Sequence, residues 1–126
     1  MIRLVTMLLG GLLALAPAAA PAFAHAHLER SDPVDGSVLA AAPSRVELEF
    51  SGDVQLAGDA LRLTSSDGTS VALDASVTGP VVTAPLPGPL PDGSYTVSYR
   101  VASADGHPAE GELSFVIGTG ASSPPP

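Results

Sequence analysis

The sequence of 126 residues contains no cysteine, no tryptophan and no lysine, and it has only three histidines and two methionines. The lack of cysteine excludes disulfides and thiolate metal ligands, so stability has to come from an apolar core. Without lysine, five arginines stand against thirteen acidic residues, and the net charge is -8. Such an acidic chain is poorly suited to the phosphate backbone of nucleic acids. We therefore expect no nucleic-acid partner.

Residues 1–24 have the layout of a secretory signal peptide. Arg3 precedes an apolar run over residues 4–15, and a small-x-small pattern ends at Ala24. A retained membrane anchor is the alternative, but the apolar run is short for a bilayer. We expect cleavage after Ala24, which would leave an exported, periplasmic or otherwise extracytoplasmic chain that begins at His25.

From residue 25 onward, apolar and polar residues alternate with a period of two, which is typical of strands with one buried face. The clearest case is residues 94–103, where Tyr95, Val97, Tyr99 and Val101 share one face. Six further segments complete the pattern: 27–31, 45–51, 60–66, 70–75, 80–86 and 112–118. Asp-Gly and proline turn signals separate them. The pattern predicts an all-β domain of about seven antiparallel strands, a Greek-key sandwich or barrel without a disulfide.

The segments also predict which side chains form the core and where the domain ends. The expected core residues are Val46, Leu48, Phe50, Leu61, Leu63, Val71, Leu73, Tyr95, Val97, Tyr99, Val101, Leu113, Phe115 and Ile117. Residues 119–126 are almost entirely glycine, serine and proline, a composition typical of a disordered tail or linker. The expected domain therefore spans residues 25–118.

After the expected cleavage, His25 is the first residue of the exported chain. Its α-amine and its ring Nδ1 can then close a chelate ring on a metal ion. Both groups release their protons readily near neutral pH, since an α-amine titrates at about 7.7–8 and an imidazole at about 6.5. A planar, nitrogen-rich donor set suits Cu(II) and, less often, Ni(II).

A second candidate group is Asp105 and His107. On an extended segment these two residues would present their side chains on the same side, and Pro108 favours an extended conformation at His107. With His25 they would supply three nitrogens and one oxygen. Zinc accepts similar ligands, but the N-terminal chelate favours copper. The alternative for this segment alone is an ordinary Asp-Gly turn with a solvated histidine.

His27 has two possible roles. It lies two residues from His25, on the same strand face, and could support the site from there. It could also create a rival site, because the α-amine, two deprotonated backbone amides and a third-position imidazole bind Cu(II) in one plane. The two modes compete, since wrapping the ion in backbone amides would prevent normal pairing of the first strand.

Two sets of residues form recognisable motifs at the beginning and near the end of the domain. The matching positions are His25, Leu28, Ser31, Pro33, Gly36, Phe50 and Ser51, and then Ser103, Asp105, Gly106, His107, Pro108, Gly111 and Phe115. This combination resembles the CopC family of exported copper-binding proteins, whose members open with His-x-x-Leu and close with Ser-x-Asp-Gly-His-Pro. The resemblance covers residues 25–118.

The resemblance implies a seven-stranded sandwich or barrel of cupredoxin-like or Ig-like appearance that holds one Cu(II) per chain. It implies that the ligands are the α-amine and imidazole of His25, the carboxylate of Asp105 and the imidazole of His107. It also implies a copper chaperone or a copper resistance and homeostasis protein that acts beside a CopD-like membrane transporter. We expect a monomer without enzymatic activity.

The chain departs from the family pattern in two places. Some relatives carry an acidic residue directly after the Phe-Ser strand end, whereas this chain has Gly52 there and Asp53 one position later. Some relatives bind Cu(I) through a methionine-rich segment, and both methionines of this chain precede Ala24. We therefore expect a Cu(II)-only site, with no clear role for Asp53.

Two other functions compete with this prediction. Copper-dependent polysaccharide monooxygenases also begin with a chelating histidine, but they use a larger domain with a flat aromatic face. The few aromatic residues of this chain fall on the apolar faces of strands, and a ligand such as Asp105 would occupy a position that oxygen chemistry needs open. The second alternative is an adhesion or carbohydrate-binding sandwich with incidental histidines.

Overall fold

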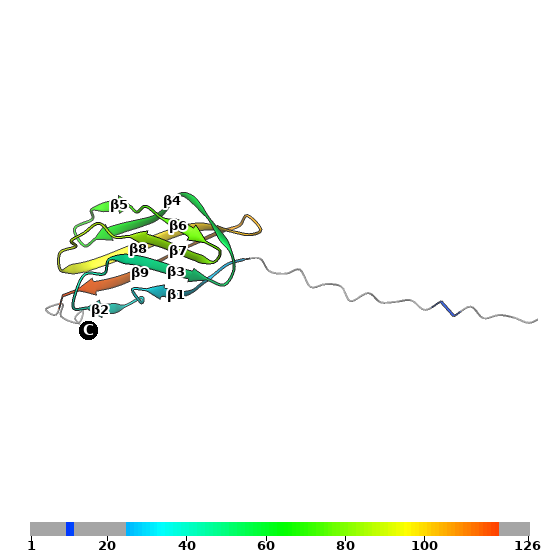
Figure 1. Ribbon diagram of the computed structural model, residues 1–126, viewed down its shortest axis with the longest axis horizontal. Helices are drawn as coiled ribbons and strands as arrows, with labels where there is room; N and C mark the ends of the chain where they lie inside the picture. Colours follow the sequence, from blue (N-terminus) through cyan, green and yellow to red (C-terminus); the bar gives the residue numbers. More distant parts are fainter. Residues whose placement is uncertain (1–9, 12–24, 119–126) are drawn as a thin grey trace, which may run out of the picture.

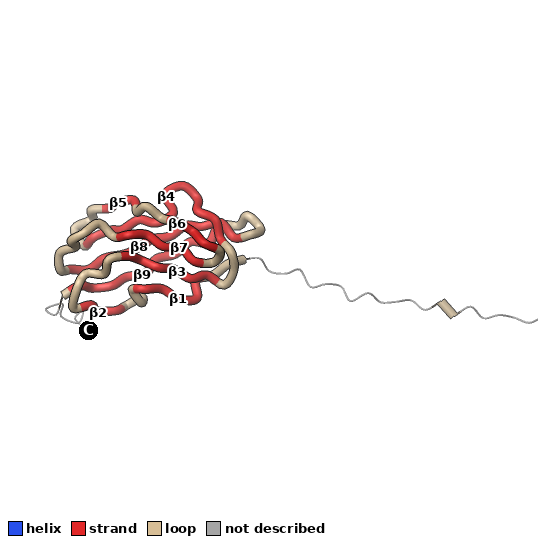
Figure 2. Tube along the Cα trace, in the orientation of Figure 1, coloured by secondary structure: helices blue, strands red, loops and turns tan. Residues whose placement is uncertain are grey.

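The computed structural model describes residues 10–11 and 25–118, and these contain strands and turns but no helix (Figure 2). The expected signal peptide and C-terminal tail fall outside the described residues, apart from residues 10–11. In the part of the chain that the structure describes, no helix is long and apolar enough to cross a membrane.

Within residues 25–118, nine strands form two sheets packed face to face (Figure 1). The four-stranded sheet has the order β1 (Leu28–Asp32), β3 (Arg45–Phe50), β7 (Val81–Pro85) and β6 (Ser76–Thr78). The five-stranded sheet has the order β2 (Ser37–Leu39), β9 (Pro108–Ile117), β8 (Gly93–Ser103), β4 (Val54–Ser65) and β5 (Ser70–Ala72). The chain passes repeatedly from one sheet to the other, as expected for a Greek-key sandwich.

The prediction of an all-β sandwich is confirmed, but the structure has two more strands than the seven predicted. The extra strands, β2 and β6, have three residues each, which is too short for an alternating pattern to be recognised. One pairing also differs from the expected antiparallel arrangement, because β2 runs parallel to β9. It does so because the turn after β1 carries the chain across to the edge of the other sheet.

The core lies between the two sheets and is formed mainly by residues with the alternating pattern, with Leu73 and Tyr99 only half-buried at its margin. Val46, Leu48, Val97 and Val101 are fully buried, and Phe115 is buried with its ring stacked on that of Tyr95. The prediction fails at Val71, which is 40% exposed. It lies on β5, an edge strand that pairs only with β4 and is exposed along its whole length.

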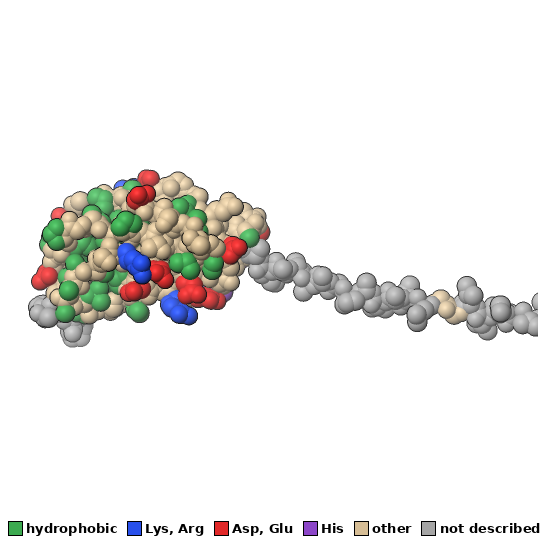
Figure 3. All heavy atoms as spheres, viewed as in Figure 1, with side chains coloured by type: hydrophobic (Ala, Val, Ile, Leu, Met, Phe, Trp, Pro, Cys, Tyr) green, Lys and Arg blue, Asp and Glu red, His purple; other side chains and the backbone are tan. Residues whose placement is uncertain are grey.

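The outer face of the four-stranded sheet carries charged side chains on β1 and β3. Figure 3 shows arginine and acidic side chains interspersed on this side of the molecule. Arg30 pairs with Glu49, and Arg45 pairs with Glu47, each at 3.5 Å. Because these pairs are exposed, each contributes at most about 1 kcal/mol to stability.

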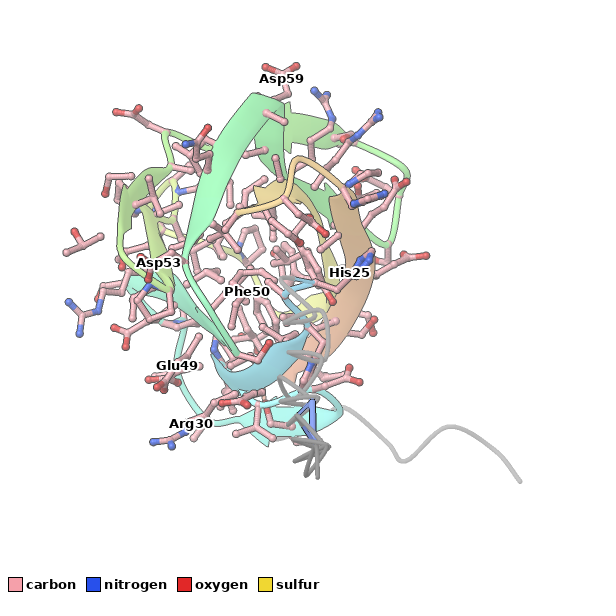
Figure 4. All side chains as sticks on the ribbon, turned by 90° about the vertical axis from the view of Figure 1, so that its right-hand side faces the viewer. His25, Arg30, Glu49, Phe50, Asp53 and Asp59 are labelled. Carbon is pink, nitrogen blue, oxygen red and sulfur yellow. The ribbon has the colours of Figure 1, made fainter. Side chains whose placement is uncertain are left out.

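One end of the sandwich brings together distant parts of the sequence. Figure 1 shows that the described chain enters at residue 25 at the same end as the loop between β8 and β9. The predicted site residues therefore lie at this end, which Figure 4 views face on.

Candidate metal centre

The loop between β8 and β9 is a tight turn that positions two of the predicted ligands. The N–H of Gly106 donates to the carbonyl of Ser103 at 2.9 Å, and the N–H of Ser103 donates to the carbonyl of His107 at 2.8 Å. Gly106 has a φ of +87°, in the left-handed region that favours glycine. The expected extended segment is therefore a turn, and the turn itself brings Asp105 and His107 together.

Asp105 faces both histidines. One carboxylate oxygen, Oδ1, accepts the backbone N–H of His107 at 3.1 Å. The other, Oδ2, lies 2.9 Å from the Nδ1 of His107 and 3.5 Å from the Nε2 of His25. The two imidazole rings lie 4.6 Å apart between centroids and are tilted by 37°.

The backbone next to His25 is held by hydrogen bonds to two serines. The N–H of Ala26 donates to the buried Oγ of Ser103 at 2.9 Å. The N–H of His27 donates to Ser51 Oγ at 3.0 Å, and the N–H of Ser51 returns a bond to the carbonyl of His27 at 2.8 Å. These bonds hold residues 25–27 beside the β8–β9 loop before β1 begins.

His25, Asp105 and His107 together form a compact donor cluster. One possible ligand atom from each residue lies within 4.8 Å of the others. The histidine side chains are 55% and 63% exposed, whereas that of Asp105 is 27% exposed. The cluster is therefore an open surface site in which the carboxylate is the least accessible donor.

Hydrogen bonding favours the ionised form of Asp105. The backbone N–H of His107 holds the pKa of the Asp105 carboxyl below its usual value, and the imidazoles of His107 and His25 lower this pKa further. Some desolvation of the carboxyl opposes these effects. A carboxylate whose ionised form is favoured, lying beside two imidazole rings, is a suitable ligand set for a divalent cation.

Two other residues considered from the sequence lie outside the cluster. His27 is 74% exposed on its side chain, and its Nε2 lies 3.8 Å from Glu29 Oε1. The carboxylate of Asp53 lies near Gly79 instead, and Figure 4 labels Asp53 and His25 on opposite sides of Phe50. The structure therefore brings three of the candidate residues together and leaves His27 and Asp53 apart from them.

The sequence prediction assigned no structural role to Ser103. The sequence does contain a signal for such a role. Ser103 continues the series Val97, Tyr99 and Val101 at a spacing of two, on the inward-facing side of β8. A residue on that face of the strand is expected to be buried, and Ser103 is only 4% exposed. A buried hydroxyl requires a hydrogen-bond partner. The sequence could not identify the partner, since Ala26 is 77 residues away.

Comparison with known proteins identifies the fold and its motifs. A family model described as the CopC domain matches residues 28–118. The chain belongs to the CopC family. This confirms the resemblance inferred from the motifs around His25 and Asp105.

Members of the CopC family with curated names include proteins of copper resistance and transport. Copper resistance protein C of Pseudomonas syringae pv. tomato is 35% identical over 123 residues, which cover 90% of this chain and 93% of that protein. Copper transport protein CutJ of Bacillus subtilis (strain 168) is 34% identical over 100 residues. That match covers 76% of this chain and 18% of CutJ, so this chain corresponds to only a small part of CutJ.

Crystal structures of two CopC-family proteins have the same fold. CopC from Methylosinus trichosporium OB3b is 33% identical with a TM-score of 0.69, and the match covers 75% of this chain and 94% of that one. PcoC, a methionine-rich copper resistance protein from Escherichia coli, is 28% identical with a TM-score of 0.58 and coverages of 74% and 98%. In contrast to a methionine-rich relative, this chain has no methionine between residues 25 and 118.

Proposed function

We propose that this chain is an exported Cu(II)-binding protein that captures or delivers one copper ion outside the cytoplasm. The observation that carries the proposal is the cluster of His25, Asp105 and His107, whose donor atoms approach within 4.8 Å. Membership of a family that includes copper resistance and copper transport proteins supports copper as the ion.

The complete site requires removal of residues 1–24. In the full chain the backbone nitrogen of His25 belongs to a peptide bond with Ala24 and is not a ligand. Cleavage would convert it into an α-amine that can chelate a metal together with the ring Nδ1. Because the ring now directs Nε2 toward Asp105, chelation requires the His25 ring to turn about its Cβ–Cγ bond. The side chain is 55% exposed, which leaves room for this rotation.

The donor set favours Cu(II) over other ions. The amine, two imidazoles and a carboxylate supply three nitrogens and one oxygen, which suits the tetragonal geometry of Cu(II). A soft Cu(I) site would need thiolate or thioether ligands, and the segment 25–118 contains no cysteine and no methionine.

The exposure of the site supports a role in binding and transfer. Both histidine side chains are more than half exposed, so a partner can approach the ion directly. We propose a CopD-like membrane transporter as this partner and a monomer as the functional form. Catalysis has less support, because Phe50, Tyr95 and Phe115 are buried in the core and do not supply an aromatic surface for a polysaccharide.

The test is copper binding by the purified chain beginning at His25. We expect one Cu(II) per chain, retained against a weak chelator, and paramagnetic resonance couplings from imidazole nitrogens. His107→Ala should reduce affinity beyond the roughly 10–100-fold that loss of a supporting residue costs at a metal site. His27→Ala is the matched control and should leave affinity unchanged. A chain that retains no stoichiometric copper would contradict the proposal and favour a plain binding sandwich.

A further inference from the structure

The first three residues of the exported chain offer Cu(II) two alternative donor sets. In the cluster mode, His25 acts together with Asp105 and His107. In the wrapped mode, the α-amine, the amide nitrogens of Ala26 and His27, and the His27 imidazole surround the ion. The wrapped mode needs each amide to release its proton to solvent, so that its nitrogen can bind the metal. The choice between these two modes rests on the proposed function, since both hold the same ion.

Both amides needed for the wrapped mode are already hydrogen-bond donors within the fold. The N–H of Ala26 donates to Ser103 Oγ at 2.9 Å in a buried position. The N–H of His27 donates to Ser51 Oγ at 3.0 Å. Ser51 also donates its own N–H to the carbonyl of His27 at 2.8 Å, so this backbone is fixed from both sides.

The packing of Ala26 opposes wrapping as well. Ala26 is 7% exposed and belongs to the hydrophobic core cluster, whereas the histidines on either side of it are exposed. Wrapping three consecutive residues around one ion would withdraw Ala26 from the core and break its bond to Ser103. The two rings also face different neighbours, since His25 lies near Asp105 and His27 lies near Glu29.

We propose that Ser103 and Ser51 are specificity-determining positioning residues, because they hold the amides of Ala26 and His27 as hydrogen-bond donors. The two serines thereby direct Cu(II) to the cluster of His25, Asp105 and His107 and away from the wrapped site. Ser103 has a second effect, because its backbone closes the loop that carries Asp105 and His107. One buried residue therefore joins the two halves of the cluster. On this account His27 is an exposed histidine that the fold keeps from competing for the ion.

The experiment tests whether Cu(II) binding depends on His107 or on His27. It uses two versions of the chain beginning at His25, one wild-type and one with both serines replaced. In the wild-type background, His107→Ala should weaken Cu(II) binding and change its visible and paramagnetic resonance spectra, and His27→Ala should do neither. In the Ser51→Ala/Ser103→Ala background the dependence should reverse. There His27→Ala should weaken binding by at least about tenfold, and His107→Ala should have a smaller effect.

Spectra provide a readout that loss of stability alone would not move. A short peptide with the sequence His-Ala-His-Leu serves as the spectral standard for the wrapped mode. We expect the absorption band of the double serine variant to shift to higher energy, toward this standard, and His27→Ala to abolish that shift. Circular dichroism in the far ultraviolet verifies that each variant is folded. If the double variant does not fold, Ser51→Ala alone replaces it, because Ser51 is exposed, and we expect a partial shift in the same direction.

The outcomes separate this proposal from the proposed function. Wild-type chain that binds no stoichiometric Cu(II) contradicts the proposed function. Wild-type chain that binds Cu(II) with the spectrum of the peptide standard overturns the positioning role while copper binding stands. Folded serine variants that keep the wild-type spectrum and the dependence on His107 also overturn it.

Discussion

Ser103 accepts the backbone N–H of Ala26 in a buried hydrogen bond of 2.9 Å that spans 77 positions of the sequence. This contact joins the first described residues to the β8–β9 loop, and the candidate metal site lies beside it. His25 precedes Ala26, and Asp105 and His107 follow Ser103 on the loop. The geometry of the site therefore depends on a residue that offers the ion no ligand in the proposed site.

Ser103→Ala should lower the stability of the whole domain. The variant leaves the buried N–H of Ala26 without its acceptor, and an unsatisfied buried donor costs about 1–3 kcal/mol. Urea unfolding followed by circular dichroism measures the free energy of unfolding. Ser94→Ala is the control, since Ser94 is exposed on the same strand and the change should stay within about 0.5 kcal/mol. Equal effects of the two substitutions would contradict the structural role of Ser103.

Leu113→Ala should destabilise the sandwich more strongly. Leu113 is 1% exposed on β9, and replacing a buried leucine by alanine costs about 2–5 kcal/mol through lost burial and the remaining cavity. Val38→Ala on β2 is the control, because Val38 is 63% exposed. We expect a large decrease in the urea midpoint for the first variant and a minor one for the second. A small decrease for Leu113→Ala would mean that the two sheets do not pack as described.

The Asp105 carboxyl should titrate at a lower pH than an unstructured aspartate in the metal-free chain, because its pKa is lowered. The backbone N–H of His107 lowers the pKa of this carboxyl from its usual value of 3.8. Because the folded pKa is below the unfolded one, the resulting stabilisation is present above pH 3.8 and is lost as the pH falls through the folded value. Carboxyl-carbon NMR titration measures the midpoint directly. A midpoint at or above that of an unstructured aspartate would show that the hydrogen bond from His107 is absent.

Copper affinity should fall as the pH decreases from 8 to 5. Protons compete with Cu(II) for the lone pairs of the α-amine and the imidazoles, because a metal ligand must be deprotonated. Asp105 stays ionised over this range because its pKa is lowered, so the nitrogen donors account for the loss. Competition with a chelator of known affinity at each pH gives the measurement. A constant affinity over the range would exclude the proposed nitrogen ligands.

Much of the fold follows from the sequence, and the exceptions have physical causes. Strands β3, β8 and β9 alternate over six or more residues, so their inward faces are evident. Strands β2 and β6 are too short to show a period, and they form because longer neighbours offer them an edge. The exposure of Val71 depends on β5 being an edge strand, which local alternation does not encode.

The candidate site is only partly evident from the sequence. The chemistry of His25, Asp105 and His107 and their place in the CopC motifs predict the cluster, and the structure brings the three residues together. The turn that presents Asp105 beside His107 differs from the extended segment expected, because Gly106 adopts a positive φ. The hydrogen bonds of Ser51 and Ser103 join residues that are far apart in the sequence, so no local sequence pattern encodes them.

The central claim is that His25 binds Cu(II) as an N-terminal residue, and its most direct test compares two chains that differ by one residue. One chain begins at His25 and the other retains Ala24 before it. Competition with a chelator measures Cu(II) affinity in each. We predict a much weaker affinity for the extended chain, because its first amine no longer belongs to His25 and cannot close the ring with Nδ1. Equal affinities would contradict the account.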